Sequence, residues 1–306
     1  MTENTRPDRL LTIGELSRLT GVPVRTIRFY CDEGILEPLR SAGGHRLFDP
    51  TAAPGQLALV RSLRMLGLGL TAIVAVLTEA LSVADAVAQE RSLLETELGA
   101  LSWRHASLAA VEAAAPAERL SRLALLAAVH DRRHAHDRLI AFWRRLLAPA
   151  APTLFDDFAA MNIPAPPTDP APRQVAAYAE LVAETADPRF AAAVAQQLWR
   201  SDPAEIRDKR ELLAEIAEVC MRVEPLIAAQ VEPRPGAELN QFIAAHARAR
   251  GVSDTPDFRR RLCTAVDTDF RVRRYWARTA EILGTATTGA AQQWLHHAVV
   301  AAAGLG

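Results

Sequence analysis

The sequence predicts a mainly α-helical protein of 306 residues with a small N-terminal unit, one long helix and an all-α C-terminal domain. Three observations lead to this prediction. Residues 10–80 hold short helical segments punctuated by glycine, together with one β-hairpin pattern. Residues 81–113 form an uninterrupted helical stretch, and apolar helical periodicity returns at about Pro116 and continues through residues 116–306.

The composition excludes several classes of protein. No run of about 18 uncharged apolar residues is present, so no transmembrane helix and no membrane partner are expected. The polar N-terminus leads into no signal-type apolar stretch, which predicts a cytoplasmic location. Three cysteines, Cys31, Cys220 and Cys263, are too few and too scattered for a disulfide framework. The net charge of −1 by itself indicates neither a nucleic acid nor a membrane as partner.

The first segment has the outline of a helix-turn-helix. A capping box from Thr12 to Glu15 predicts the start of a short helix, which Gly21 ends. A second helix is expected from about Pro23, a residue suited to the first turn, to Gly34, which fits the left-handed position after a helix. Two short helices joined by a tight turn that contains glycine are typical of this motif.

A β-hairpin follows the two helices. Leu39-Arg40 and His45-Arg46-Leu47-Phe48 flank Ser41-Ala42-Gly43-Gly44, which predicts two strands and a four-residue loop. A further pair of helices is expected at about 54–67 and 70–80. These elements together predict one domain over residues 10–80.

The stretch 81–113 carries a heptad pattern. Val87, Leu94, Leu101 and Leu108 recur every seven residues, and Ala84, Leu98 and His105 occupy intermediate positions of the same pattern. Arg91 interrupts the pattern as a polar residue. One interpretation is a long amphipathic helix packed on its own domain. We favour a dimerisation helix with Val87, Leu94, Leu98, Leu101 and Leu108 in the seam, and hence a homodimer.

The second predicted helix has two different sides. At 100° per residue, the apolar side holds Val24, Ile27 and Cys31, and the opposite side holds Arg25, Arg28, Phe29 and Asp32. Exposed arginines usually form a solvated face, so this pattern alone is weak. The order of elements sharpens it: capped helix, glycine turn, arginine-bearing helix, hairpin with Arg40 and Arg46, long heptad helix. Such a helix suits insertion into a DNA groove.

These residues resemble the MerR (mercury-resistance regulator) family of bacterial transcription regulators over about residues 10–110. The matching runs are Leu11–Ser17, Thr20–Val22, Val24–Tyr30, Gly34–Leu36, Arg40–Asp49 and Leu63–Leu68. The resemblance implies a winged helix-turn-helix and a dimer joined by an antiparallel coiled coil. It also implies binding to a pseudo-palindromic promoter site in double-stranded DNA, distortion of that site, and RNA polymerase as a partner at the promoter.

The resemblance also assigns DNA contacts by position. The residues concerned are Thr12, Arg25, Thr26, Arg28, Tyr30, Arg40, His45 and Arg46. The second helix would meet the major groove and its phosphates, Tyr30 would hydrogen-bond the DNA backbone, and the hairpin residues would grip phosphates. Because phosphate contacts position a protein on DNA, these arginines should supply salt-dependent affinity more than sequence choice.

Three departures from the family pattern stand out. Pro23 replaces the usual Ser or Thr N-cap, so one helix-terminal donor loses a side-chain acceptor. Phe29 and Cys31 replace common Tyr and acidic residues, and Phe29 has no hydroxyl for a phosphate. The spacing between Asp49 and Gly67 is about one residue longer than usual and contains Pro54-Gly55, which predicts a late helix start. None of these removes an arginine expected at phosphate.

The remainder of the chain reads as an all-α domain over residues 116–306. The expected helices lie near 117–147, 173–186, 188–200, 203–230, 236–250, 256–283 and 287–303. Prolines are frequent in residues 148–173, which predicts a linker or a meandering loop there.

A metal or iron–sulfur sensor is not expected. Residues 100–150 contain no cysteine, so the thiolate ligands of such sites are absent. His130 and His134 are i,i+4 neighbours, with His136 nearby, and this geometry can share a metal. The intervening charged residues favour a solvated helix face, so we predict no metal site and no cofactor.

Aromatic residues suggest a different ligand. Most of them lie after residue 116 and are expected to form core. Family members with such extensions often capture organic molecules between helices, which implies a small organic effector. The candidate residues are Trp143, Trp199, Tyr275 and Trp276. In pairs such as Phe142-Trp143 and Tyr275-Trp276, one ring can face a cavity while its neighbour packs.

Two alternatives differ in class. The first is an effector-independent regulator whose C-terminal domain binds a protein partner. The second is a helical enzyme fused to a DNA-binding domain. No nucleophile elbow, Walker loop, dinucleotide fingerprint or zinc-protease motif is present, so we predict no catalytic residues and no enzyme.

Overall fold

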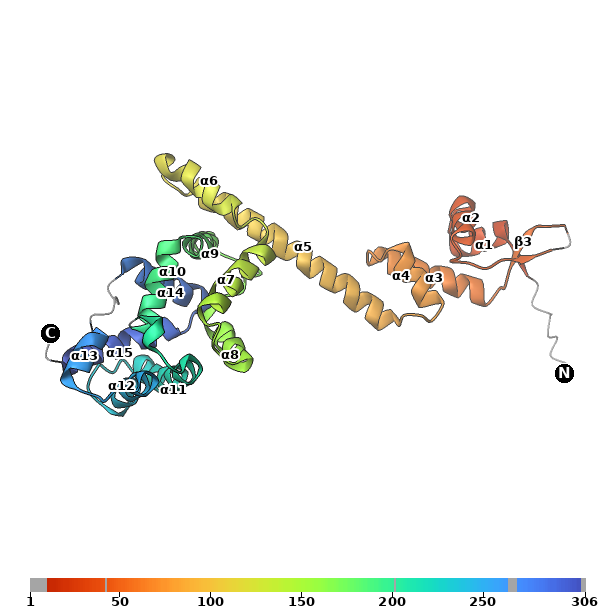
Figure 1. Ribbon diagram of the computed structural model, residues 1–306. Helices are drawn as coiled ribbons and strands as arrows, with labels where there is room; N and C mark the ends of the chain where they lie inside the picture. The colour runs from red at the N-terminus through yellow and green to blue at the C-terminus, as the bar shows by residue number, and fades with distance from the viewer. Residues whose placement is uncertain (1–9, 42, 201, 264–268, 304–306) are drawn as a thin grey trace. The chain divides into compact units, whose positions relative to one another are not determined.

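The computed structural model of the protein describes residues 10–41, 43–200, 202–263 and 269–303. It divides into two compact units, one up to Leu98 and the other from Gly99 onward. Helices dominate both units, and a small sheet lies in the first (Figure 1). The predicted fold class, a winged helix-turn-helix followed by an all-α region, is confirmed. No helix in the described ranges has both the length and the apolar character that a bilayer span requires.

The first unit begins with the predicted pair of helices and the hairpin. Its first elements are β1 (Leu11–Thr12), α1 (Ile13–Thr20), α2 (Val24–Asp32), β2 (Leu39–Arg40) and β3 (Arg46–Phe48). The sheet is antiparallel, in the order β1-β3-β2. Strand β1 is not among the predicted elements, because two residues are too short to show a period-2 pattern.

Two further helices complete the core of the first unit, α3 (Ala52–Met65) and α4 (Leu70–Leu77). The side chains of Leu16, Ile27 and Leu57 are fully buried there. The prediction of a late start for α3 is wrong. Asp49 accepts hydrogen bonds of 2.8 Å from the backbone N–H groups of Thr51 and Ala52, so the helix begins before Pro54. These bonds hold the pKa of Asp49 below its ordinary value.

Helix α5 (Val83–Glu112) begins in the first unit and ends in the second. Ala86 belongs to the core of the first unit. In the second unit, Trp103, Ala106 and Ala110 belong to the core. Their spacing of three and four residues places them on one side of the helix.

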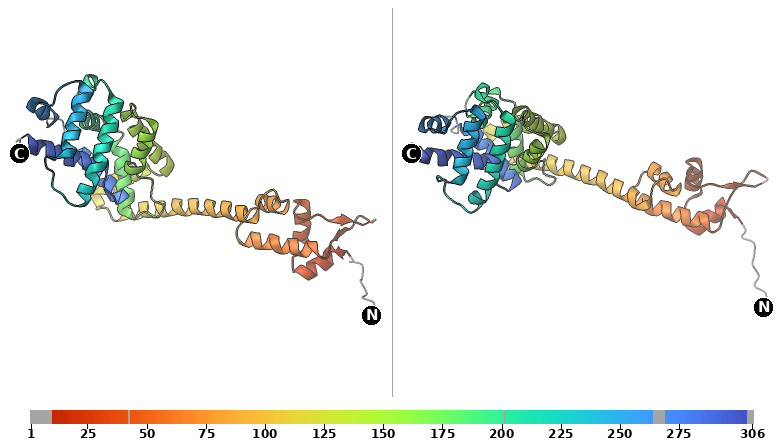
Figure 2. Two further views of the ribbon diagram at one scale, coloured as in Figure 1. Left: turned by 90° about the horizontal axis from the view of Figure 1, so that it is seen from below. Right: turned by 60° about the horizontal axis from the view of Figure 1, so that its bottom comes forward.

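The second unit consists of packed helices, which Figure 2 shows from two further sides. They are α6 (Arg119–Ala127), α7 (Arg132–Leu146), α8 (Pro152–Asn162), α9 (Pro172–Glu184), α10 (Pro188–Trp199), α11 (Lys209–Ala228), α12 (Ala237–Arg250), α13 (Pro256–Cys263), α14 (Phe270–Leu283) and α15 (Thr288–Ala302), with short 3₁₀ turns η1 (Pro116–Glu118) and η2 (Pro203–Glu205). Helix α9 packs against α6, α7 and α14, and α11 packs against α12 and α15.

Several predicted helices are interrupted. The helix expected over 117–147 breaks before α7, where Asp131 caps the new helix by accepting a 3.0 Å hydrogen bond from His134 N–H. Helix α11 begins only at Lys209, whereas 203–230 was predicted as one helix. The helix expected over 256–283 is described as α13 and α14, and residues 264–268 between them lie outside the described residues.

The prediction of a loop over residues 148–173 is wrong in its middle. Helix α8 occupies residues 152–162, with Pro152 in its first turn, where proline lacks no needed donor. Phe155 is buried beneath the guanidinium of Arg144, whose central carbon lies 4.4 Å from the ring centroid. The prolines therefore flank a helix here, and burial of its apolar residues stabilises it.

Candidate nucleic-acid interface and ligand pocket

The outer side of α2 presents the predicted arginines. Arg25 and Arg28 are exposed, Thr26 is half-buried, and Ile27 on the opposite side is fully buried in the core. Phe29 is 44% exposed, as the helical pattern predicts. The geometry leaves both guanidinium groups in solvent and without a hydrogen bond or ion pair to the rest of the described chain.

The hairpin adds further cations. Arg40 and His45 are exposed. Arg46 on β3 is half-buried, and its Nη2 lies 2.8 Å from Oδ1 of Asp32 at the end of α2. This ion pair ties the hairpin to α2 and fixes the direction of the Arg46 side chain. Because the pair is largely exposed, its contribution to stability is small.

Thr12, Tyr30 and Pro23 have structural roles that bear on the predicted contacts. Thr12 is the N-cap of α1: Glu15 N–H donates to its Oγ1 at 3.3 Å, while the Glu15 carboxylate accepts from Thr12 N–H at 2.8 Å. Tyr30 packs in the core, and only 9% of its surface is exposed. Pro23 caps α2 with no side-chain hydrogen bond, which leaves the first N–H groups of α2 available to an anion.

Helix α5 has two different sides. The predicted seam residues are exposed, from 37% for Val87 to 63% for Leu98, although they are large and apolar. The side that packs on the second unit is instead lined by Gly99, Trp103 and small alanines. The seam is therefore not used for packing within the chain.

The second unit contains an apolar pocket of about 150 Å³. Helices α7, α8, α10, α11, α14 and α15 line it. Trp143, Phe158 and Trp276 form an aromatic wall, with ring centroids 5.0 Å apart between Trp143 and Phe158 and 5.2 Å apart between the two tryptophans. Met161 and Met221 are 40% and 56% exposed and mark the edge of the pocket at the surface.

The four predicted effector residues divide between two places. Trp143 and Trp276 line the pocket. Tyr275 lies behind the wall, where its hydroxyl accepts a 2.8 Å hydrogen bond from Trp143 Nε1 and where burial raises its pKa. Trp199 does not line the pocket and is buried, with its carbonyl oxygen accepting from Arg250. Each adjacent aromatic pair thus turns one ring to the pocket and one to the core.

Sequence reasoning missed the polar residues of the pocket. Asn162 is fully buried, accepts a 2.8 Å hydrogen bond from Thr288 N–H and donates to the Phe158 carbonyl at 3.0 Å. Gln292 lies 3.7 Å from the Cys220 thiol, and burial raises the pKa of that thiol to about 12. Asp157 and Glu224 also line the pocket. No local motif marks these residues, because they come together only through helix packing.

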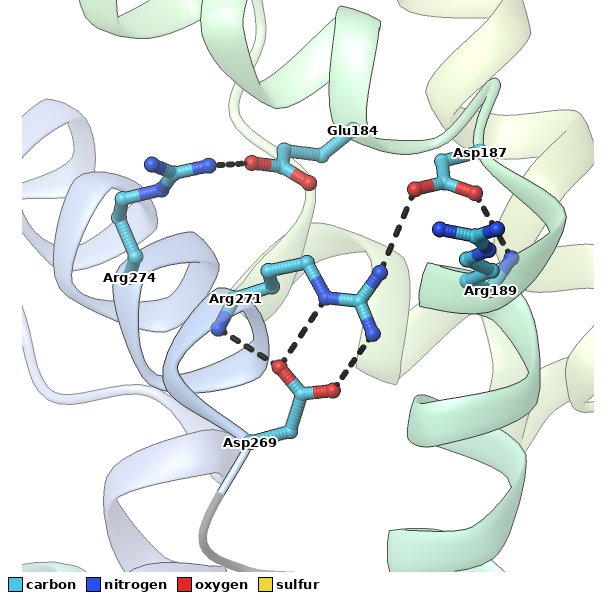
Figure 3. A network of polar contacts seen from close by, with 6 residues as sticks. All are labelled: Glu184, Asp187, Arg189, Asp269, Arg271 and Arg274. Carbon is cyan, nitrogen blue, oxygen red and sulfur yellow. Dashed lines mark hydrogen bonds and ion pairs between the residues drawn. The ribbon is translucent and has the colours of Figure 1, made fainter.

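The other side of α14 carries a row of ion pairs, shown in Figure 3. Arg271 contacts Asp269 at 2.8 Å and Asp187 at 3.3 Å. Arg274 pairs with Glu184 at the end of α9. These contacts hold α14 against α9 and the start of α10, and so fix the helix that supplies Trp276 to the pocket.

The histidines near α7 make separate contacts. His130 Nδ1 lies 3.0 Å from the Ala127 carbonyl, and His136 Nδ1 lies 3.2 Å from the Pro164 carbonyl. The backbone N–H of His134 donates a hydrogen bond to the Asp131 carboxylate, which caps α7. Across the described ranges, no three His, Cys, Asp or Glu side chains gather closely enough to hold a metal ion.

Comparison with known proteins yields a family match in the first unit. Residues 12–48 match the model of the family described as MerR family regulatory protein. Two proteins named nodulation protein NolA, from Bradyrhizobium diazoefficiens and Bradyrhizobium sp. (strain NC92), are 32% and 33% identical over 99 residues. Each match covers 32% of this chain, and the chain spans only 41% of the length of these relatives. No solved structure gives a significant match.

Proposed function

We propose that the protein is a DNA-binding transcription regulator, because residues 12–48 match the model of the MerR family of regulatory proteins. It binds a pseudo-palindromic promoter site as a homodimer, distorts that site where RNA polymerase acts, and responds to a small organic effector in its second unit. A protein with this role acts in the cytoplasm, where the bacterial chromosome lies.

One observation carries the DNA-binding proposal. The region that matches the family presents Arg25 and Arg28 from α2, and Arg40 from the hairpin, into solvent. Unpaired guanidinium groups on a recognition helix are suited to guanine edges and phosphates. The uncapped N-terminus of α2 adds backbone N–H donors for a phosphate.

The exposed seam of α5 supports the homodimer. Leu94, Leu98, Leu101 and Leu108 are between 46% and 63% exposed within one chain, which is unfavourable for a row of leucines in water. A second copy of α5 running antiparallel covers these residues with equivalent ones. Two DNA-binding units related by a two-fold axis then read a palindromic site.

The pocket supports an organic effector over a protein partner. A concave site lined by apolar and aromatic side chains, with a few polar groups, is typical of small-molecule binding. Trp276 belongs to this pocket, and the opposite side of α14 is fixed to α9 by ion pairs. We expect occupancy of the pocket to act on α14 and, through these ion pairs, on α9, whose Tyr178 contacts Trp103 of α5.

The test selects DNA for binding to the full-length protein from a random duplex library. We expect enrichment of an inverted repeat that binds two chains per site. The double variant Arg25→Ala/Arg28→Ala should lose about a hundredfold in affinity for the selected duplex, because each guanidinium contributes roughly 1–3 kcal/mol.

The control removes two exposed arginines from the second unit, Arg133→Ala/Arg145→Ala. It loses the same charge and should keep wild-type affinity. Enrichment of no sequence, or equal affinity for both double variants, would count against the proposal.

A further inference from the structure

The pocket has room for a single aromatic ring, and one edge of the pocket is open to solvent. Its volume of about 150 Å³ matches that of an apolar cavity, also about 150 Å³, known to hold benzene. The wall of Trp143, Phe158 and Trp276 offers flat faces on which an aromatic ring stacks. A ligand larger than one ring therefore extends past Met161 and Met221 toward solvent.

The edge of the pocket carries unpaired negative charge. Asp157 on α8 is exposed and Glu224 on α11 is half-buried, and both line the pocket. Neither carboxylate has a hydrogen bond or an ion pair with another described residue. No lysine, arginine or histidine lines the described pocket. The charges therefore favour a cation at the mouth and disfavour an anion there.

The geometry points to an aryl-alkyl ammonium compound as the ligand of this pocket. Its ring stacks within the aromatic wall, a short alkyl chain crosses the apolar interior, and its protonated amine reaches Asp157 and Glu224. This inference rests on the proposed effector role of the pocket and narrows the effector to amphipathic organic cations.

Three probes that share a phenylpropyl group and differ in charge test whether the pocket prefers a cation. Calorimetric titration of the full-length protein would use 3-phenylpropylamine, 3-phenylpropanol and 3-phenylpropionate, which carry a positive charge, none and a negative charge at pH 7. We expect the amine to bind about fivefold to tenfold more tightly than the alcohol, and the carboxylate to bind least. The preference for the amine should shrink with added salt.

Two double variants test whether Asp157 and Glu224 cause the preference for the amine. Asp157→Asn/Glu224→Gln should abolish the preference for the amine while leaving alcohol binding unchanged. Asp156→Asn/Glu218→Gln removes the same charge from exposed, non-lining positions on the same two helices and should keep the preference. A preference that survives the first pair, or is lost equally in both, overturns the proposal.

The remaining outcomes separate the ligand class from the effector role. Equal affinity for all three probes overturns the cationic class and leaves an apolar effector pocket standing. Binding of none of them overturns the class as well. A preference for the amine that changes neither the affinity for the selected DNA nor its distortion supports the ligand class and contradicts the effector role.

Discussion

The two units build their candidate sites in opposite ways. The first unit exposes its candidate DNA-binding residues: Arg25, Arg28 and Arg40 project from short, regular elements into solvent. The second unit encloses its site, a pocket that six helices assemble from residues as distant in sequence as Trp143 and Gln292. The first site depends on local geometry and charge, and the second depends on the packing of a large core.

The two candidate sites should therefore tolerate different perturbations. A surface of charged side chains loses binding when its charges change, but its fold barely responds. A pocket formed by packed helices responds to changes of volume or buried charge anywhere in its walls. Helix α5 combines both kinds of surface: one side is buried in the core of the second unit, and the other side exposes a row of apolar residues.

The largest effect is expected at the exposed seam of α5. Leu98→Lys/Leu101→Lys places like charges in the proposed dimer interface. Sedimentation should show a monomer, and DNA affinity should fall by more than about a hundredfold, because two linked half-sites become independent. The stability of each unit should change by less than about 0.5 kcal/mol, since both leucines are exposed.

Thr96→Lys/Ala100→Lys is the matched control for this variant. Both residues are exposed and lie on a different side of α5 from the seam. The control should remain dimeric. If the seam variant also remains dimeric and binds DNA normally, α5 does not form the dimer.

Two glycines sharpen the contrast between the units. Any Cβ at Gly289 on α15 would overlap the indole ring of Trp276, so Gly289→Ala should destabilise the second unit by about 2–3 kcal/mol. Gly55 on α3 has no neighbour within 4 Å of such a Cβ. Gly55→Ala should therefore stabilise the first unit by about 0.5–1 kcal/mol. Urea unfolding measures both, and the same sign for both would contradict the packing described.

The pH dependence of stability should belong to the second unit. Burial, together with Arg200 and Arg250, lowers the pKa of His246 well below its ordinary 6.5. Below pH 6.5 the unfolded chain takes up a proton that the folded chain does not, so stability falls as the pH falls. The slope should approach about 1.4 kcal/mol per pH unit.

Tryptophan fluorescence during urea unfolding at pH 5–8 reports this loss, because all five tryptophans lie in the second unit. His246→Asn should flatten the profile between pH 5 and 6.5. His130→Gln, at an exposed histidine, should leave it unchanged. An identical slope in wild type and His246→Asn would show that His246 is not the group responsible.

The smallest effect is expected at the ion pair between α2 and the hairpin. Asp32→Asn removes a charge that is 63% exposed, so stability should change by less than about 1 kcal/mol. The freed Arg46 guanidinium and the lost negative charge should raise DNA affinity about twofold to threefold. Weaker DNA binding would mean that the pair is needed to orient Arg46.

The sequence predicted the first unit because its signals are local. The capping box at Thr12, the glycine turn and the hairpin each lie within a few residues, and each agrees with the structure. Errors arose where tertiary packing decides. Helix α8 was predicted as a loop because its flanking prolines were visible, whereas the burial of Phe155 that stabilises it was not.

The pocket was only half predictable for the same reason. Trp143 and Trp276 were recognised as aromatic candidates, and both line it. Asn162, Asp157 and Glu224 carry no motif, since their roles depend on helices that meet only in the folded chain. Trp199 was a candidate on residue type alone, and the structure places it in the core.

The most direct test of the central claim is the salt dependence of DNA binding. Fluorescence anisotropy with the selected duplex, between about 50 and 200 mM salt, should show a linear fall of log affinity with log salt. Arg46→Ala should weaken binding about tenfold at the lower salt and reduce the slope by about one, while Arg145→Ala matches wild type. Binding that is independent of salt and unaffected by Arg46→Ala would contradict a DNA-binding role for the first unit.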